Sequence, residues 1–315
     1  MKSMLQGARI VVEVCMGVRK GEKVLVITDP PRSRIAEAIA SVARERGAEV
    51  TLICMPVGQR HGQEPPEPVA LAMPYFDVII APTTYSLTHT QARLRACEAG
   101  ARVATMPMIT EEMMRGGAML ADYLEVAKLT KRVAAALDRA SKVEVTTEAG
   151  TNLSFSIEGR KAHPDTGLFH RPGDFGNLPA GEAFIAPVEG TGEGTVVVDG
   201  SMLDDVSGGV EITIKKGVAQ RISGPLARKL TQLLREAGPK SRNLAEFGIG
   251  TNPKARLIGN VLEDEKVLGT CHVALGDNST FGGRVKAGSH IDGIFKSPTV
   301  KLDGKTVMKN GRLMI

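Results

Sequence analysis

The amino-acid sequence predicts an α/β protein in which an N-terminal domain with a parallel sheet precedes a β-rich domain. Residues 23–107 alternate short apolar runs with segments of helical apolar spacing. From residue 142 onward the chain consists mainly of short runs separated by Gly, Asn, Asp and Pro. Strand–helix alternation favours a parallel sheet covered by helices, whereas closely spaced short strands favour antiparallel sheets. We therefore assign residues 1–138 to the α/β domain and residues 139–315 to the β-rich domain.

Four apolar runs and the helices between them define the predicted first domain. Each run is short and bounded by turn residues, which is typical of buried strands. Residues 33–46 carry apolar side chains at helical spacing, and Gly47 follows as a C-terminal stop. Residues 91–100 and 118–140 are two further predicted helices. The four predicted strands are residues 23–28, 49–55, 77–82 and 102–107.

The second domain is predicted from hairpin signals. Residues 142–160 form two alternating runs about a glycine-containing turn. The glycine-rich residues 190–195 run into a strand, so we expect a hairpin turn there rather than a phosphate-binding loop. The first strand–helix turn, residues 28–34, contains no glycine, which argues against a dinucleotide site. Residues 225–237 are the one predicted helix among these strands.

The composition of the chain indicates its cellular compartment and argues against some classes of binding partner. The net charge of +5 is spread along the chain, whereas nucleic-acid binding normally requires a basic stripe with stacking aromatics. The four cysteines form no CxxC pair, which is typical of reduced thiols in a cytosolic protein. No apolar run approaches the roughly 20 residues that span a bilayer. We expect a cytoplasmic protein that binds neither nucleic acid nor membranes.

Two histidines and an aspartate predict a metal site in the last third of the chain. His290 and Asp292 lie two residues apart in a predicted strand, so their side chains share one face. His272 lies in another short apolar run, where a buried imidazole needs a partner. Imidazole and carboxylate together suit zinc, cobalt, manganese or ferrous iron. The alternative is a hydrogen-bonded His–Asp pair that holds no metal.

Two glutamates could add to this site. Glu182 and Glu246 each lie in an otherwise apolar run, and a buried carboxylate is costly without a partner. They could balance a second cation, or they could lie on the exposed face of an edge strand. The charged residues 264–266 are expected to form a solvated turn. Neither a GxSxG elbow nor an HExxH helix is present, which argues against serine hydrolases and zincins.

Three segments of the second half resemble one enzyme family, the metallo-aminopeptidases typified by aminopeptidase T, AmpS and PepS, with leucyl aminopeptidase-like thermophilic metalloproteases. These segments are NLPAGEAFIAP (residues 177–187), the run AEFGIG to CHVALG (residues 245–276) and GSHIDGI (residues 288–294). Weaker similarity extends into the first domain. The resemblance implies that each chain folds into an α/β domain followed by a β-rich domain, and that two such chains form a homodimer.

The resemblance also implies an activity and a ligand set. Family members hold two divalent ions, usually zinc or cobalt, and hydrolyse the N-terminal residue of small peptides with a metal-activated water. The metal ligands of the family match Glu182, Glu246, His272, His290 and Asp292 of this sequence. We also assign a catalytic role to the two glutamates. The leading prediction is therefore a metal-dependent aminopeptidase, a hydrolase.

Two alternatives stay open. The ring-cleaving 2,5-dihydroxypyridine 5,6-dioxygenase is similar to these aminopeptidases but uses one ferrous iron, held by residues that match His272, His290 and Asp292. The other alternative is a non-catalytic, metal-stabilised binding protein. It follows from the lack of any tyrosine after residue 123, because the aminopeptidases place one after the histidine that matches His272. Asn278 or Ser279 could replace it.

Overall fold

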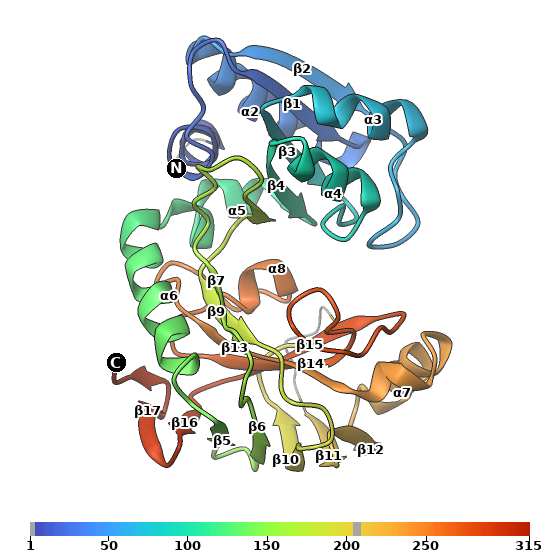
Figure 1. Ribbon diagram of the computed structural model, residues 1–315, viewed down its shortest axis with the longest axis vertical. Coiled ribbons are helices and arrows are strands. Elements are labelled where there is room, and N and C mark those ends of the chain that lie inside the picture. Colours follow the sequence, from blue (N-terminus) through green and yellow to red (C-terminus); the bar gives the residue numbers. More distant parts are fainter. Residues whose placement is uncertain (1–3, 204–208) are drawn as a thin grey trace. The chain divides into compact units, whose positions relative to one another are not determined.

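The structure is a computed structural model that describes residues 4–203 and 209–315, which form two compact units (Figure 1). Unit 1 comprises the chain up to Glu125 together with Thr166–Ala180, and unit 2 comprises Val126–Asp165 and Gly181–Ile315. This division differs from the boundary predicted at 138/139. The chain returns to unit 1 for a short segment because that segment adds a strand to the sheet there.

Unit 1 contains the predicted parallel sheet, and all of its strand pairs are parallel. Across the sheet the strands are β2 (Glu49–Cys54), β1 (Lys23–Thr28), β3 (Val78–Thr83), β4 (Arg102–Pro107) and β8 (Phe175–Asn177). Strands β3 and β4 are buried along their whole length, as expected for a parallel sheet covered on both faces. The four predicted strands are confirmed to within a residue at each end. Strand β8 was missed, because three residues carry too short a pattern.

Helices α2 (Ser33–Glu45) and α4 (Gln91–Glu98) match their predictions closely. The shorter helices of unit 1 are α1 (Met4–Arg9), which continues as a π-helix over Ile10–Cys15, α3 (Glu67–Ala72) and α5 (Glu111–Arg115). The helix predicted over residues 118–140 is shorter, since α6 covers Tyr123–Leu137. Its start is fixed by Asp122, whose carboxylate accepts hydrogen bonds from the backbone amides of Leu124 and Glu125.

Unit 2 contains two antiparallel sheets, most of α6 and, among its described residues, the helices α7 (Ala227–Glu236) and α8 (Val261–Asp264) (Figure 1). The larger sheet contains, in order, β12 (Val218–Ser223), β11 (Val210–Lys215), β10 (Glu193–Val198), β6 (Asn152–Ser156), β5 (Lys142–Thr146), β16 (Thr299–Leu302), β17 (Lys305–Lys309) and β18 (Arg312–Leu313). The smaller sheet contains β15 (His290–Phe295), β14 (Cys271–Gly276), β13 (Leu244–Gly250), β9 (Glu182–Ile185) and β7 (His163–Asp165). The predicted α/β class is confirmed.

One detail of the hairpin prediction is wrong. Residues 190–195 do run into a strand, β10, but the preceding strand β9 belongs to the smaller sheet. The glycine-rich stretch therefore crosses between the two sheets of unit 2 instead of turning within one of them.

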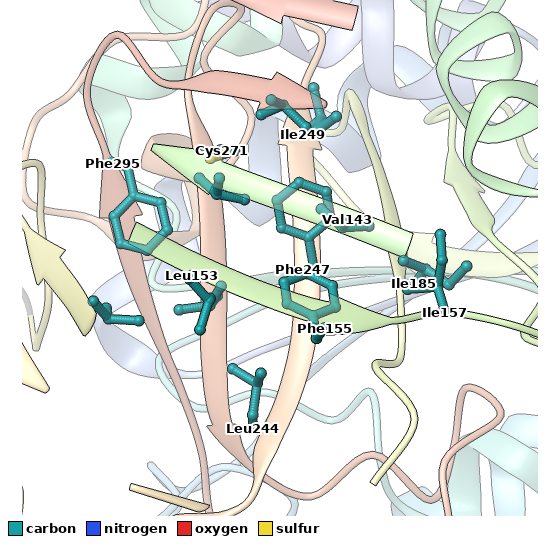
Figure 2. Packing of buried hydrophobic residues seen from close by; sticks show 14 of the residues in the cluster. Val143, Leu153, Phe155, Ile157, Ile185, Leu244, Phe247, Ile249, Cys271 and Phe295 are labelled. Atoms are coloured by element: carbon teal, nitrogen blue, oxygen red, sulfur yellow. The ribbon is translucent and has the colours of Figure 1, made fainter. Parts of the chain in front are cut away.

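The hydrophobic core of unit 2 lies between its two sheets (Figure 2). From the larger sheet, Leu153 and Phe155 point into it, and the smaller sheet contributes Phe247, Cys271 and Phe295. The rings of Phe155 and Phe247 meet at a centroid distance of 5.5 Å. Because side chains alternate along a strand, the neighbours of these core residues in the smaller sheet point to its other face.

Two inferences from composition can be compared with the structure. All four cysteines carry free thiols, as predicted. Among the described residues, none of the helices combines the length and the apolar character that crossing a bilayer would require.

A partly buried ion pair joins β4 to Glu22, the residue before β1, and yields a stability prediction. Arg102 of β4 donates from both terminal nitrogens to Glu22, at 3.1 and 2.9 Å. Burial alone would raise the pKa of Glu22, but Arg102 and the backbone amide of Arg19 lower it below 4.5. We expect Glu22→Gln to lower the free energy of unfolding at neutral pH by about 1–3 kcal/mol.

The difference should shrink in acid, because a carboxylate with a lowered pKa stabilises the fold above its unfolded pKa and loses that effect as the pH falls. Denaturant unfolding at neutral pH and at a pH below the lowered pKa of folded Glu22 measures the two differences in free energy of unfolding. The control is Glu144→Gln, which removes an exposed pair with Lys142 and should change little. Equal effects of the two variants would contradict the prediction.

Candidate metal centre

The centre lies on the face of the smaller sheet that points away from the core. Along β14, Cys271 and Val273 enter the core, so His272 between them points to the other face. Along β15, His290 and Asp292 share that face for the same reason. The alternation predicted from the sequence therefore operates in the structure.

Strand β13 reaches the same face through an irregularity. Leu244 and Phe247 both point into the core although they lie three positions apart, an odd spacing that strict alternation forbids. The pairing register with β14 shifts between Leu244 and Glu246, the signature of a β-bulge. After the bulge, Glu246 points to the centre and Phe247 to the core.

Glycines opposite the acidic and imidazole groups make room for them. Gly248 pairs with His272, and a Cβ built on Gly248 would lie 2.2 Å from Nε2 of His272. Gly250 pairs with Glu182 of β9. The imidazole of His272 therefore occupies space that any larger residue at position 248 would fill.

The structure brings all five predicted ligands together. Nε2 of His272 lies 3.3 Å from Oε2 of Glu182 and 3.3 Å from Oε1 of Glu246. Nε2 of His290 lies 3.4 Å from Oε2 of Glu246 and 3.6 Å from Oδ1 of Asp292. The carboxylate of Glu246 thus lies between the two imidazoles.

A sixth residue, Glu265, belongs to the same cluster. Three overlapping sets of donor atoms have all their members within 4.8 Å of one another. The sets are Glu182–Glu246–His272, Glu246–His290–Asp292 and Glu265–His272–Asp292. Each set shares a residue with each of the others, so the six side chains form one connected group of potential ligands.

The orientation of His290 suits a metal ligand. Its Nδ1 lies 2.8 Å from the backbone carbonyl oxygen of Asp277, which can only accept a hydrogen bond. Nδ1 must therefore carry a proton, and once Nε2 is deprotonated its lone pair points towards Glu246 and Asp292. Metal-bound histidines commonly donate their other ring nitrogen to a carbonyl in this way.

Buried polar atoms in the centre lack the partners that a cation would provide. Oε2 of Glu182, Oδ1 of Asp292 and Nδ1 of His272 are buried and form no hydrogen bond with any of the described residues. Buried carboxylate oxygens without a hydrogen-bond donor are costly, and a divalent ion or a protonated imidazole beside them reduces that cost. The donor set of imidazoles and carboxylates therefore fits a first-row divalent metal such as ferrous iron, zinc, cobalt or manganese.

Protons take the place of the cation when the centre holds no metal. Burial opposes charge on His272, but Glu246 and the other nearby carboxylates raise its pKa to about 9. Burial likewise favours neutral Glu246, but the two imidazoles lower its pKa. Metal binding must therefore displace protons from the histidines, as it does at most protein sites.

The solvated turn predicted at residues 264–266 is wrong. Asp264 ends helix α8 and is fully buried, with Oδ1 and Oδ2 accepting hydrogen bonds from the backbone amides of Ile258 and Gly259. Lys266 is 1% exposed. Its Nζ lies 2.5 Å from Oε1 of Glu182. A run of charges favours a surface turn by composition, and only the tertiary contacts place it inside.

An aromatic wall, formed by His163, Phe184 and Phe281, adjoins the centre. His163 and Phe184 stack with ring centroids 5.3 Å apart. Phe281, in the loop between β14 and β15, meets Phe184 edge-on at 5.5 Å and His290 edge-on at 5.8 Å. The sequence analysis did not single out these residues, which lie far apart along the chain and carry no shared motif.

The residues considered as replacements for a tyrosine have structural roles instead. Asn278 donates to Glu189 and accepts from the backbone amide of Val285. Ser279 donates its hydroxyl to Asp277. Both order the loop that follows β14.

Fold and centre together define a protein with an α/β unit and a β-rich unit that carries a candidate metal centre. The chain belongs to the NicX family, 2,5-dihydroxypyridine 5,6-dioxygenase, whose model matches residues 3–315. The 2,5-dihydroxypyridine 5,6-dioxygenase of Pseudomonas putida is 25% identical over 260 residues, covering 72% of this chain and 74% of that protein.

Two solved structures share the fold. The 2,5-dihydroxypyridine dioxygenase from Pseudomonas putida aligns with a TM-score of 0.83 and 19% identity, over 99% of this chain and 96% of that one. AmpT from Thermus thermophilus aligns with a TM-score of 0.74 and 16% identity, over 99% of both chains.

The predicted membership of the aminopeptidase family is therefore wrong, and so are the hydrolase class and the peptidase function. The family match places the chain among ring-cleaving dioxygenases, the first of the two alternatives. The error has a physical reason. One fold can host different reactions, and both the dioxygenase and AmpT structures share the fold of this chain.

The close approach of Gly248 to His272 yields a test of the centre. Gly248→Ala would force the imidazole of His272 out of its position, since the new Cβ would overlap the ring. We expect the affinity for Co²⁺ to fall about 10- to 100-fold, as when the supporting residues of a metal ligand are changed. Isothermal titration calorimetry of the metal-free protein measures this.

Gly58→Ala is the matched control, because its Cβ would make only ordinary contacts, at 3.6–3.8 Å. Circular dichroism of both variants checks the fold. Unchanged Co²⁺ affinity in folded Gly248→Ala would show that His272 does not ligate the ion.

Proposed function

We propose that this protein is a ring-cleaving dioxygenase that opens a dihydroxylated pyridine ring with molecular oxygen. The family match over residues 3–315 carries this proposal, and the cluster of imidazoles and carboxylates supports it. The named relative acts on 2,5-dihydroxypyridine, so this compound is the first substrate to test. The substrate replaces the small peptide expected from the aminopeptidase resemblance.

One ferrous ion is the proposed cofactor, in place of the predicted pair of zinc or cobalt ions. His272, His290 and Asp292 would hold it, with Glu246 beside both imidazoles. Two histidines with one carboxylate are the donor set typical of non-haem ferrous oxygenases. Such an ion supplies the one-electron chemistry that allows molecular oxygen to react with an aromatic ring.

The side chains of the centre handle the protons of the substrate. A ring hydroxyl must lose its proton to make the ring electron-rich. Burial raises the pKa of Glu265 to about 8 despite the opposing charge of Lys266. A carboxyl group with a pKa near neutrality is partly ionised at neutral pH, and its ionised form can accept the hydroxyl proton. We assign that role to the Glu265 carboxylate, which the predicted site did not include.

Oxygen consumption tests the proposed reaction. Metal-free protein loaded anaerobically with Fe²⁺ should consume one molecule of oxygen for each 2,5-dihydroxypyridine, and the ring absorbance should disappear in step. Asp292→Ala should fall to the rate of the metal-free protein, because it removes a ligand. An oxygen electrode and ultraviolet absorbance provide the two readings. A folded, Fe²⁺-loaded protein that consumes no oxygen with any dihydroxypyridine isomer would refute the proposal.

The aromatic wall is proposed to orient the planar ring of the substrate. Phe184 and Phe281 present ring surfaces next to His290, and stacked or edge-on aromatic pairs each contribute about 0.5–1.5 kcal/mol. Phe281→Ala should therefore raise KM about 2- to 10-fold with a smaller change in kcat. Steady-state oxygen uptake measures both constants.

Phe281→Leu is the control for lost bulk, and it should retain part of the KM effect because only the aromatic surface is removed. A change in kcat alone would assign Phe281 to the support of His290 rather than to substrate binding.

Three further features are proposals of the same kind. We propose a homodimer and a cytoplasmic location, and we propose no nucleic-acid or membrane partner. The thinly spread net charge of +5 supports the last of these. Size-exclusion chromatography with light scattering tests the dimer.

A further inference from the structure

We propose that the ammonium group of Lys266 takes the place of a second metal ion and so limits the centre to one divalent ion. The inference rests on the proposed function in one respect, since it assumes that the first ion binds beside His272, His290 and Asp292.

Three carboxylates from three segments converge on this ammonium group. Its Nζ lies 2.5 Å from Glu182 of β9, 2.6 Å from Glu265 and 3.6 Å from Asp165 of β7. The lysine is 1% exposed, so little water reaches the charges. Three converging carboxylates in a buried position are what a divalent cation would require.

Glu182 connects this position to the metal ligands. Its Oε1 contacts Nζ of Lys266, while its Oε2 lies 3.3 Å from Nε2 of His272. Carboxylates that contact two cations in this way are typical of two-metal sites, where the ions lie about 3.5–4 Å apart. Here one of the two cations is covalently part of the chain.

The backbone holds Lys266 where it is. Its amide donates to the carbonyl of Glu263, and its carbonyl accepts from the amide of Asn252. Gly250 lets this segment lie against the end of β13, because a Cβ there would meet the backbone of Val267 at 2.1 Å. These contacts fix the backbone of Lys266 beside the three carboxylates, so its side chain starts from a defined position.

A purely structural role for Lys266 makes a different prediction. If Lys266 only neutralised buried carboxylates, its removal would destabilise the protein without creating a place for metal. If it replaces an ion, a neutral residue of similar length leaves three carboxylates that can bind one. The number of ions per chain separates these possibilities, independently of any enzymatic activity.

The experiment is a titration with Co²⁺, read by calorimetry and by elemental analysis after gel filtration. The wild-type chain should bind one Co²⁺. Lys266→Met and Lys266→Gln, purified in the presence of Co²⁺, should bind two. The double variant Lys266→Met/Glu265→Gln should return to one, because it removes a ligand of the new site. Lys142→Met, at an exposed lysine that also pairs with a glutamate, should stay at one.

Two results would overturn the inference. One is a wild-type chain that binds two Co²⁺ ions, which requires no variant to fold. The other is a folded Lys266→Met chain that still binds one. The outcomes also separate this inference from the proposed function. A second ion in Lys266→Met, with no oxygen uptake by the Fe²⁺-loaded wild type, would refute the reaction and leave the role of Lys266 intact.

Discussion

The burial of negative charge on one face of a small sheet is the constraint on which the rest of the centre depends. Glu182, Glu246 and Asp292 lie on that face, with Glu265 beside them. A sheet can carry such a group only if cations or protons balance it, because isolated buried carboxylates are strongly unfavourable. Lys266 supplies one permanent positive charge. The histidines supply the remainder, either as imidazolium ions or as ligands of a metal, so charge balance and metal binding are one requirement.

The same strands that carry the centre also build the core, which ties function to stability. In β14, Cys271 and Val273 pack against the larger sheet while His272 faces the carboxylates. Core packing fixes each strand, and thereby fixes the ligands to within the tolerance that metal coordination demands. The core therefore pre-organises the centre, and no loop has to order before an ion can bind to His272, Glu246 or Glu182.

Much of this arrangement follows from residue spacing. Two-residue periodicity placed His290 and Asp292 on one face, and strand–helix alternation predicted the parallel sheet of unit 1. Spacing could not reveal Glu265 and Lys266, since a charged run is normally exposed and only contacts with β7 and β9 bury it. Nor could it reveal the reaction, because one fold can carry different chemistries. The sequence did not predict strand β8, because its three residues form a strand only through pairing with β4.

The bulge in β13 has a consequence for how this chain can evolve. One extra residue between Leu244 and Glu246 decides which side chains enter the core and which reach the centre. A substitution in β13 changes one side chain on one face of the strand. A single insertion or deletion would instead move every following side chain to the opposite face. Relatives of this protein should therefore keep the length of β13 as well as Glu246 and Gly248. The length of the strand thus determines both which residues fill the core and which residues reach the centre.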